Sequence, residues 1–180
     1  MRGVIRAPGF SLIELMVVVA VTAILLAVAV PSFNTLLINN RSAAQANAFV
    51  DSLNYARAEA VKRPQSQPVY VSTADGGANW QVGWQVWVDA NNNGLYDGSS
   101  ELLKLYAKLS GATTLVSTTP TGLTDVIFIN TGAARAKVGT TGNTSASFTF
   151  HYSPGSSFCR DVIIKNTGLI FIPTAGVACP

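Results

Sequence analysis

The chain has 180 residues, of which 48% are hydrophobic and only 12% are charged, and its formal net charge is +3. This length is typical of a single domain, and the apolar excess favours a membrane segment. Two of the positive charges come from Arg2 and Arg6, close to the N-terminus. The basic balance therefore does not indicate a nucleic-acid-binding protein, which requires clustered Lys and Arg on one face.

The N-terminus combines a short basic stretch with a long apolar run. Residues 1–9 contain both arginines, the apolar run begins at Phe10, and from Leu15 to Val30 the only polar side chain is Thr22. A helix of about 20 apolar residues spans the ~30 Å hydrocarbon core of a bilayer. Because the basic residues precede the run, we expect a cytoplasmic N-terminus in the inner membrane, with the remainder exported.

Glu14 distinguishes two interpretations of this run. The first is an ordinary secretory signal, for which Ala27-Val28-Ala29 would provide a cleavage site. However, a carboxylate in an apolar helix costs about 2.5–3.5 kcal/mol at the membrane centre and less near the interface. Secretory signals do not normally contain one. Glu14 therefore favours a functional role in which an opposite charge is supplied.

The sequence Gly9-Phe10-Ser11-Leu12-Ile13-Glu14-Leu15 resembles the class III signal of type IV prepilins and type II secretion pseudopilins. The resemblance implies that a prepilin peptidase cuts after Gly9 and methylates Phe10. It also implies that Glu14 pairs with the N-terminal amine of a neighbouring subunit, which sets the filament register. Two opposite charges in a low-dielectric environment each require such a partner. Pro31 matches a proline that many family members carry near this point.

After Pro31 the pattern remains helical and becomes amphipathic, so we predict one helix from about Ser11 to about Lys62, ended by Pro64. The segment LNYARAEAVK, residues 53–62, resembles the minor pilin and pseudopilin H subgroup, of the FimT, FimU and GspH type. Its composition also fits a plain alanine-rich helix with Arg57 and Glu59 in solvent. Both interpretations can hold together.

From Pro68 onward the hydrophobic period changes from 3.6 to 2, which indicates strands. The predicted strands are 68–73, 80–88, 102–106, 126–129, 146–152, 162–164 and 169–172. The last two are joined by a hairpin at Asn166-Thr167-Gly168, and turns or loops are predicted over 139–147. The fold class is α+β, with a long N-terminal helix packed on a C-terminal antiparallel β domain. The resemblance implies two small sheets beside the helix.

The predicted organisation is a leader at 1–9, a transmembrane and filament-core helix at 10–30, its amphipathic continuation at 31–63 and a β-rich domain at 64–180. Cys159 and Cys179 are the only cysteines, without a CxxC motif or a Cys/His cluster that would indicate zinc. In an exported protein they indicate a disulfide, which would contribute about 3 kcal/mol. The alternative is two free buried thiols.

One polar turn resembles a calcium loop. Its oxygen-bearing side chains occupy loop positions 1, 3, 5 and 9, with Gly94 at position 6. Position 12 is Ser100, however, and Glu101 comes one residue too late to supply the bidentate ligand. We therefore favour a polar hairpin turn over a metal site. The candidate calcium ligands are Asp89, Asn91, Asn93 and Asp97.

The sequence gives no indication of an enzyme. His151 is the only histidine, and no Ser or Cys nucleophile lies at a motif spacing from it. We interpret His151 as a structural side chain, and we expect neither a catalytic residue nor a cofactor. A phosphate-binding loop and a catalytic carboxylate pair are also not recognisable.

Three functions are consistent with these features. The leading one is a minor type IV pilin that helps initiate or cap pilus assembly, with other minor pilins and the major pilin as partners. The second is a type II secretion pseudopilin at a pseudopilus tip. In either case the chain would pass from the inner membrane to the periplasm or the cell surface.

The third is a DNA-binding minor pilin of natural transformation. Related DNA-binding proteins carry a Gly-Arg-x-Arg motif near the C-terminus, where this chain has Gly168-Leu169-Ile170-Phe171. A few remaining charges would give only weak, salt-sensitive binding, so DNA is not an expected partner. The candidate basic residues are Arg135, Lys137, Arg160 and Lys165.

Overall fold

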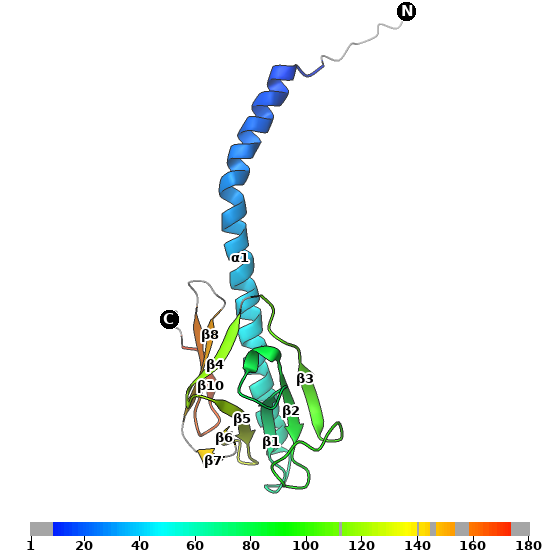
Figure 1. Cartoon of the computed structure of the whole chain (residues 1–180), viewed down its shortest axis with the longest axis vertical. Coiled ribbons are helices and arrows are strands. Elements are labelled where there is room, and N and C mark those ends of the chain that lie inside the picture. Colours follow the sequence, from blue (N-terminus) through cyan, green and yellow to red (C-terminus); the bar gives the residue numbers. More distant parts are fainter. Residues whose placement is uncertain (1–8, 112, 140, 145–146, 154–158, 174–180) are drawn as a thin grey trace, which may run out of the picture. The chain divides into compact units, whose positions relative to one another are not determined.

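The computed structural model describes residues 9–111, 113–139, 141–144, 147–153 and 159–173, and it divides the chain into two compact units, Met1–Ile38 and Asn39–Pro180. Helix α1 (Leu12–Val61) begins in the first unit and ends in the second (Figure 1). The helix predicted from the sequence is confirmed to within a residue at each end. It continues through Pro31, although proline cannot donate the usual backbone hydrogen bond.

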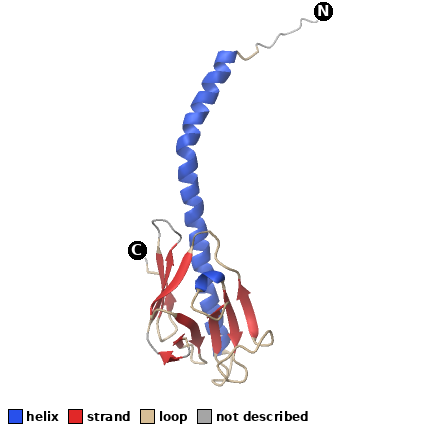
Figure 2. Cartoon of the chain, in the orientation of Figure 1, coloured by secondary structure: helices blue, strands red, loops and turns tan. Residues whose placement is uncertain are grey.

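The second unit contains the strands, which are antiparallel and arranged in two sheets (Figure 2). The six-stranded sheet has the order β3-β2-β1-β5-β6-β7. Its strands are β1 (Val69–Thr73), β2 (Trp84–Val88), β3 (Leu102–Tyr106), β5 (Leu123–Phe128), β6 (Ala134–Val138) and β7 (Thr141–Thr144). The four-stranded sheet has the order β10-β9-β8-β4. Its strands are β4 (Thr114–Thr119), β8 (Phe148–Ser153), β9 (Arg160–Ile164) and β10 (Ile170–Phe171). The α+β prediction is confirmed.

The C-terminal half of α1 packs on both sheets through one apolar stripe. The stripe recurs at helical spacing and is fully buried; it comprises Ala46, Phe49, Leu53, Ala56 and Ala60. The Phe49 ring lies edge-on to Trp84, at 5.2 Å, and to Phe150, at 4.9 Å. Because Trp84 belongs to β2 and Phe150 to β8, this one ring joins the helix to both sheets.

The buried indole groups of this core have hydrogen-bond partners, as burial requires. Nε1 of Trp84 donates to the Ser52 hydroxyl at 2.8 Å, and that hydroxyl donates to the Phe49 carbonyl at 2.6 Å. Nε1 of Trp80 donates to the Leu123 carbonyl at 2.8 Å. The tryptophans therefore add apolar area to the core without leaving a buried donor unpaired.

Strand alternation separates a core face of the six-stranded sheet from an outer face. In β1, Val69 and Val71 belong to the main core, whereas Tyr70 belongs to a second small cluster with Trp87 and Ile127. These three residues are cross-strand partners, with Tyr70 opposite both Trp87 and Ile127. The outer face therefore has a small aromatic core of its own.

Several predicted strand boundaries are wrong. Residues Trp80–Val82 form a short 3₁₀ helix instead of the start of β2. Gly83 separates the two elements at φ 107°, and a Cβ there would lie 2.5 Å from the Tyr106 carbonyl oxygen. The strand predicted at 126–129 begins three residues earlier as β5, and the one predicted at 146–152 is β8.

Three strands were not predicted, namely β4, β6 and β7. β7 lies in the 139–147 segment that was expected to consist of turns or loops. Its Thr, Gly and Asn residues are typical of loops, and the segment becomes a strand through its antiparallel pairing with β6. Pairing with a neighbour therefore outweighs local propensity here.

Candidate functional site

The predicted cleavage site lies immediately before α1. Residues 1–8 of the predicted leader are outside the described residues, whereas Gly9 and Phe10 are described and exposed. The Phe10 side chain is 84% exposed. The Gly9–Phe10 bond precedes the first helical residue, so a peptidase would not need to unwind the helix to reach it.

Ser11 and Glu14 form a reciprocal cap at the start of α1. The Ser11 backbone N–H donates to Oε2 of Glu14 at 2.9 Å, and the Glu14 backbone N–H donates to the Ser11 Oγ at 3.3 Å. This is the capping-box arrangement, which satisfies two backbone donors that helix geometry leaves free. The Ser11 hydroxyl also donates to Oε2 at 2.9 Å. Among the described residues, Oε1 of Glu14 accepts no hydrogen bond.

The surface around Glu14 is apolar. Glu14 lies in a shallow depression lined by Phe10, Ile13, Val17 and Val18. The apolar side chains from Leu12 to Val30 are exposed all around the helix, and the hydroxyl of Thr22 donates within the helix to the Val18 carbonyl at 2.7 Å. This helix is long and apolar enough to cross a membrane. The carboxylate is therefore the one charged group on an otherwise apolar surface from residue 10 to residue 30.

The polar turn between β2 and β3 uses its oxygens to hold its own backbone. Asp89, which is 1% exposed, accepts the backbone N–H groups of Asn93 at 3.0 Å and Gly94 at 2.8 Å. Asp97 accepts the side-chain amides of Asn91 at 2.7 Å and Asn93 at 2.8 Å. In the described part of the chain no group of three or more His, Cys, Asp or Glu residues could hold a metal ion. Calcium binding therefore gains no support, and the preference for a polar hairpin turn over a metal site stays a prediction.

Glu101 closes this turn. It is 4% exposed, and its carboxylate accepts the backbone N–H groups of Ala90 at 3.1 Å and Asp97 at 2.9 Å. Glu101 lies one residue after the position of the bidentate calcium ligand, and its contacts here are those of a structural residue. A turn held at both ends by buried carboxylates is fixed in place.

Burial raises the pKa of Tyr70 to about 12, with smaller contributions from the charges of Asp89 and Asp125. An unfolded tyrosine titrates near pH ~10, so above that pH the unfolded chain loses its proton first. The stability that neutral Tyr70 provides is present below pH ~10 and is lost as the pH rises to ~12. As the pH rises through this range, we predict that the free energy of unfolding decreases by up to about 2 kcal/mol less in Tyr70→Phe than in the parent.

Urea unfolding of both proteins at pH 9 and pH 11.5 measures this difference. Lysine titration is common to the two proteins and cancels in the comparison. An equal loss of stability in the parent and in Tyr70→Phe would show that Tyr70 is not the group responsible.

The four candidate DNA contacts are divided between the two sheets. Arg135 and Lys137 lie on β6, whereas Arg160 begins β9 and Lys165 follows it. Nζ of Lys137 donates to the Gly94 carbonyl at 3.3 Å and lies 3.9 Å from Asp125, and Nζ of Lys165 lies 5.8 Å from the Phe171 ring centroid. Lys137 is therefore partly neutralised, and the expectation that DNA is not a partner stays a prediction.

The cysteine and histidine predictions have different outcomes. Cys159 is 3% exposed and disulfide-bonded, whereas Cys179 lies outside the described residues, so their pairing stays a prediction. His151 is 7% exposed, and its Nδ1 lies 2.8 Å from Oδ1 of Asp161, its cross-strand partner. Asp161 was not identified from the sequence, because the contact depends on the register of β8 and β9.

Arg57 is the position where the structure most changes the sequence interpretation. Its side chain was expected to lie in solvent, but Nε donates to the Gly132 carbonyl at 3.1 Å and Nη2 lies 3.5 Å from the Thr167 carbonyl. Gly132 lies in the turn between β5 and β6, and Thr167 in the turn between β9 and β10. Arg57 therefore connects α1 to a turn of each sheet.

Glu59 also has partners. Its carboxylate lies 2.7 Å from Lys62 and 3.4 Å from Arg63, and the hydrogen bond from Lys62 lowers the pKa of Glu59. The side chain of Glu59 is 17% exposed, so it does not lie in solvent as the plain-helix interpretation had it. These pairs lie at the end of α1, where cationic side chains are favourable for the helix dipole.

Comparisons with known proteins give two family matches. The family model described as Type II transport protein GspH matches residues 45–168, and the model described as prokaryotic N-terminal methylation motif matches residues 6–30. The second match contains Gly9, Phe10, Glu14 and the apolar run. No curated protein matches the chain.

Among solved structures, two crystal forms of the type IV minor pilin FimU from Pseudomonas aeruginosa (strain PAO1) are similar to this chain. Their TM-scores are 0.49 and 0.48, each at 20% sequence identity. The similarity covers 73% of this chain in both cases, and 85% and 90% of the two FimU chains.

Proposed function

Because the chain belongs to the GspH family of type IV pilin-like proteins, we propose that it is a minor pilin that helps initiate or cap a type IV pilus. The observation that carries the proposal is Glu14, the one charge on an apolar helix surface directly after an accessible Gly9–Phe10 bond. This arrangement provides a processing site, a membrane anchor and an assembly contact within the first 30 residues.

The exposed helix explains why the chain would assemble. The apolar side chains from Leu12 to Val30 cover all sides of α1, so they require hydrocarbon or the helices of other subunits around them. When the chain leaves the membrane and enters a filament surrounded by water, α1 exchanges the hydrocarbon of the bilayer for the apolar helices of other subunits. Other minor pilins and the major pilin are the proposed partners, since they present the same type of helix.

Glu14 would set the axial offset between the α1 helices of two neighbouring subunits. Cleavage after Gly9 creates a positively charged amine at Phe10, close to the carboxylate of Glu14 on an apolar surface. The cap contacts of Glu14 use Oε2, and Oε1 has no hydrogen bond in the described part of the chain. A neighbouring subunit's amine can therefore bind Oε1 while the Ser11 cap remains. An offset helix would leave two charges without partners, which is costly at low dielectric.

A gene deletion tests whether the chain initiates or caps filaments. Initiation predicts that the deletion strain has fewer surface filaments of ordinary length, with full recovery when the gene is restored. Electron microscopy of sheared and cell-attached filaments gives both number and length. An unchanged number and length of filaments would contradict the proposal.

The family description favours one second candidate, a pseudopilin of a type II secretion system. The same deletion strain distinguishes the two machines. A pseudopilin predicts that secreted proteins accumulate in the periplasm while surface filaments remain normal. A minor pilin predicts normal secretion with a loss of filaments.

A further inference from the structure

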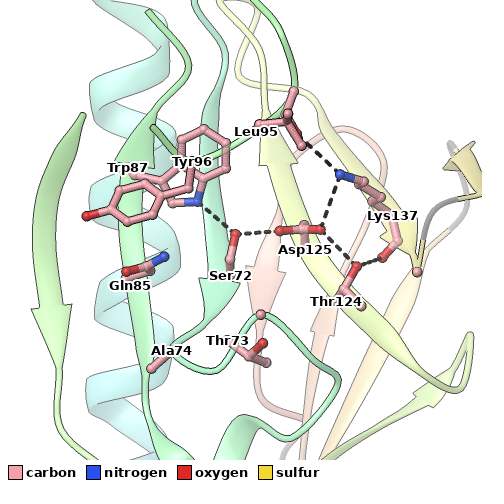
Figure 3. Close-up of a pocket in the computed structure, with 13 residues that line it drawn as sticks. Ser72, Thr73, Ala74, Gln85, Trp87, Leu95, Tyr96, Thr124, Asp125 and Lys137 are labelled. Atoms are coloured by element: carbon pink, nitrogen blue, oxygen red, sulfur yellow. Dashed lines mark hydrogen bonds and ion pairs between the residues drawn. The ribbon is translucent and has the colours of Figure 1, made fainter. Parts of the chain in front are cut away.

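The outer face of the six-stranded sheet carries a continuous row of polar side chains. Ser72 lies opposite Gln85 on one side and Asp125 on the other, and Asp125 lies opposite Lys137. The row thus takes one residue from each of β2, β1, β5 and β6, all of them interior strands of the sheet. These side chains line a depression of about 500 Å³ (Figure 3). Small-molecule sites have volumes of about 300–1,000 Å³.

The turn between β2 and β3 forms one wall of this depression. Gly94, Leu95 and Tyr96 line it, and the Tyr96 ring lies 5.6 Å from the ring of Trp87. The Tyr96 side chain is 38% exposed and Leu95 is 62% exposed, so both present apolar surface to a ligand. Because Asp89 and Glu101 fix the turn through backbone hydrogen bonds, this wall is in place before any ligand arrives.

The polar groups of the floor are also held in position. Nε1 of Trp87 donates to the Ser72 hydroxyl at 2.8 Å, and that hydroxyl donates to Oδ1 of Asp125. The Thr124 hydroxyl lies 2.8 Å from Oδ2 of the same carboxylate. Figure 3 shows these contacts running from Trp87 across the floor to Lys137. Preorganised donors and acceptors reduce the entropy lost on binding.

The chemistry of the lining restricts the ligand class. Asp125 and Lys137 have opposite charges 3.9 Å apart, so the site does not favour an anion such as phosphate. A lipid chain is also a poor match, because it would leave the carboxylate, ammonium, amide and hydroxyl groups of the floor without partners. An extended peptide would need a free strand edge, whereas all four floor strands are paired on both sides.

From these features we propose that the depression binds a neutral saccharide. Ring hydroxyls both donate and accept, so they match a floor in which Asp125 accepts, Lys137 donates and Gln85 does both. The apolar C–H face of a sugar ring can pack on Tyr96, whose ring is amphipathic. Binding at this site would give the protein a recognition role separate from the assembly contact at Glu14.

Titration calorimetry on the processed full chain tests the proposal. The protein is held in a detergent with a phosphocholine headgroup, because sugar detergents would compete for the site. The probes are lactose, maltose, cellobiose and N-acetylglucosamine. We expect saturable binding of at least one of them. We also expect Asp125→Asn and Tyr96→Ala each to weaken it about tenfold or more, as loss of a partly buried charged hydrogen-bond partner or of a ring contact would.

Asp51→Asn is the matched control, since Asp51 is an exposed carboxylate on α1 and should bind like the parent. Thermal unfolding verifies that each variant is folded. If Asp125→Asn does not fold, the binding result for Tyr96→Ala decides the test, because Tyr96 is exposed. Three results would overturn the proposal: no saccharide binds, the two pocket variants bind like the parent, or inorganic phosphate displaces the saccharide. None of them affects the filament proposal, because purified chains are tested without assembly.

Discussion

Replacing Glu14 with alanine should exclude the chain from filaments while leaving its processing intact. The variant keeps Gly9 and Phe10 for the peptidase but leaves a neighbouring amine without its carboxylate. Removing the carboxylate would leave the amine uncompensated at low dielectric, so we expect at least about a hundredfold loss of incorporation. Quantitative immunoblotting of sheared filaments against membrane fractions measures the ratio. Normal incorporation of the variant would contradict the register argument.

Two further variants separate the charge of Glu14 from its role as a helix cap. Glu14→Gln keeps an acceptor for the Ser11 backbone, since glutamine also forms a capping box, but it removes the charge. Ser11→Ala removes the hydroxyl contacts and keeps the charge. The ion-pair account predicts poor incorporation for Glu14→Gln and near-normal incorporation for Ser11→Ala. The opposite pattern would mean that the cap, and not the charge, is needed.

Gly168→Ala should be the most damaging small substitution in the C-terminal unit. A Cβ at this position would collide with the Gly132 carbonyl oxygen and would lie 2.9 Å from Nε of Arg57. The backbone of Gly168 is also at φ 79°, which side chains disfavour. Because two turns and Arg57 would have to separate, we expect a loss of about 3 kcal/mol or more. Thermal unfolding in detergent should show a decrease in Tm of about 6 °C or more.

Gly76→Ala is the matched control for this prediction. Gly76 has a similar backbone angle, φ 70°, but a Cβ there would meet nothing within 4 Å. It should therefore show only the cost of the backbone conformation, about 1 kcal/mol. Equal effects of the two substitutions would mean that the close approach of the turns contributes little to stability.

The sequence predicts the helix and its ends well because these depend on local chemistry. An apolar run, an amphipathic continuation and Pro64 are sufficient to define α1. The hairpin between β9 and β10 is also predicted, because two short apolar runs flank Asn166-Thr167-Gly168, which favours a turn. In both cases the information lies within a few adjacent residues.

Elements that depend on pairing were missed. β6 reads Ala-Arg-Ala-Lys-Val, and its core-facing residues Ala134 and Ala136 give a weak strand signal. The basic residues of β6 were only weighed as candidate DNA contacts, whereas the register places Lys137 beside Asp125. The outer-face depression likewise depends on the register of four strands, which no local pattern specifies.

Arg57 shows the same limit for the helix. Its surroundings in the sequence predict a helical position correctly, but the carbonyl groups that it contacts lie 75 and 110 residues away. A solvated arginine and a connecting arginine have the same local sequence. Only the packed structure of the C-terminal unit distinguishes them.

The most direct test of the central claim is the intact mass and N-terminal sequence of the chain purified from its native membrane. Our account predicts a mature chain that starts at N-methylphenylalanine, at position 10. The mass should also be two hydrogens below the dithiol value if Cys159 and Cys179 are bridged. A chain that starts at Val30 would identify an ordinary secreted protein and would contradict the filament account.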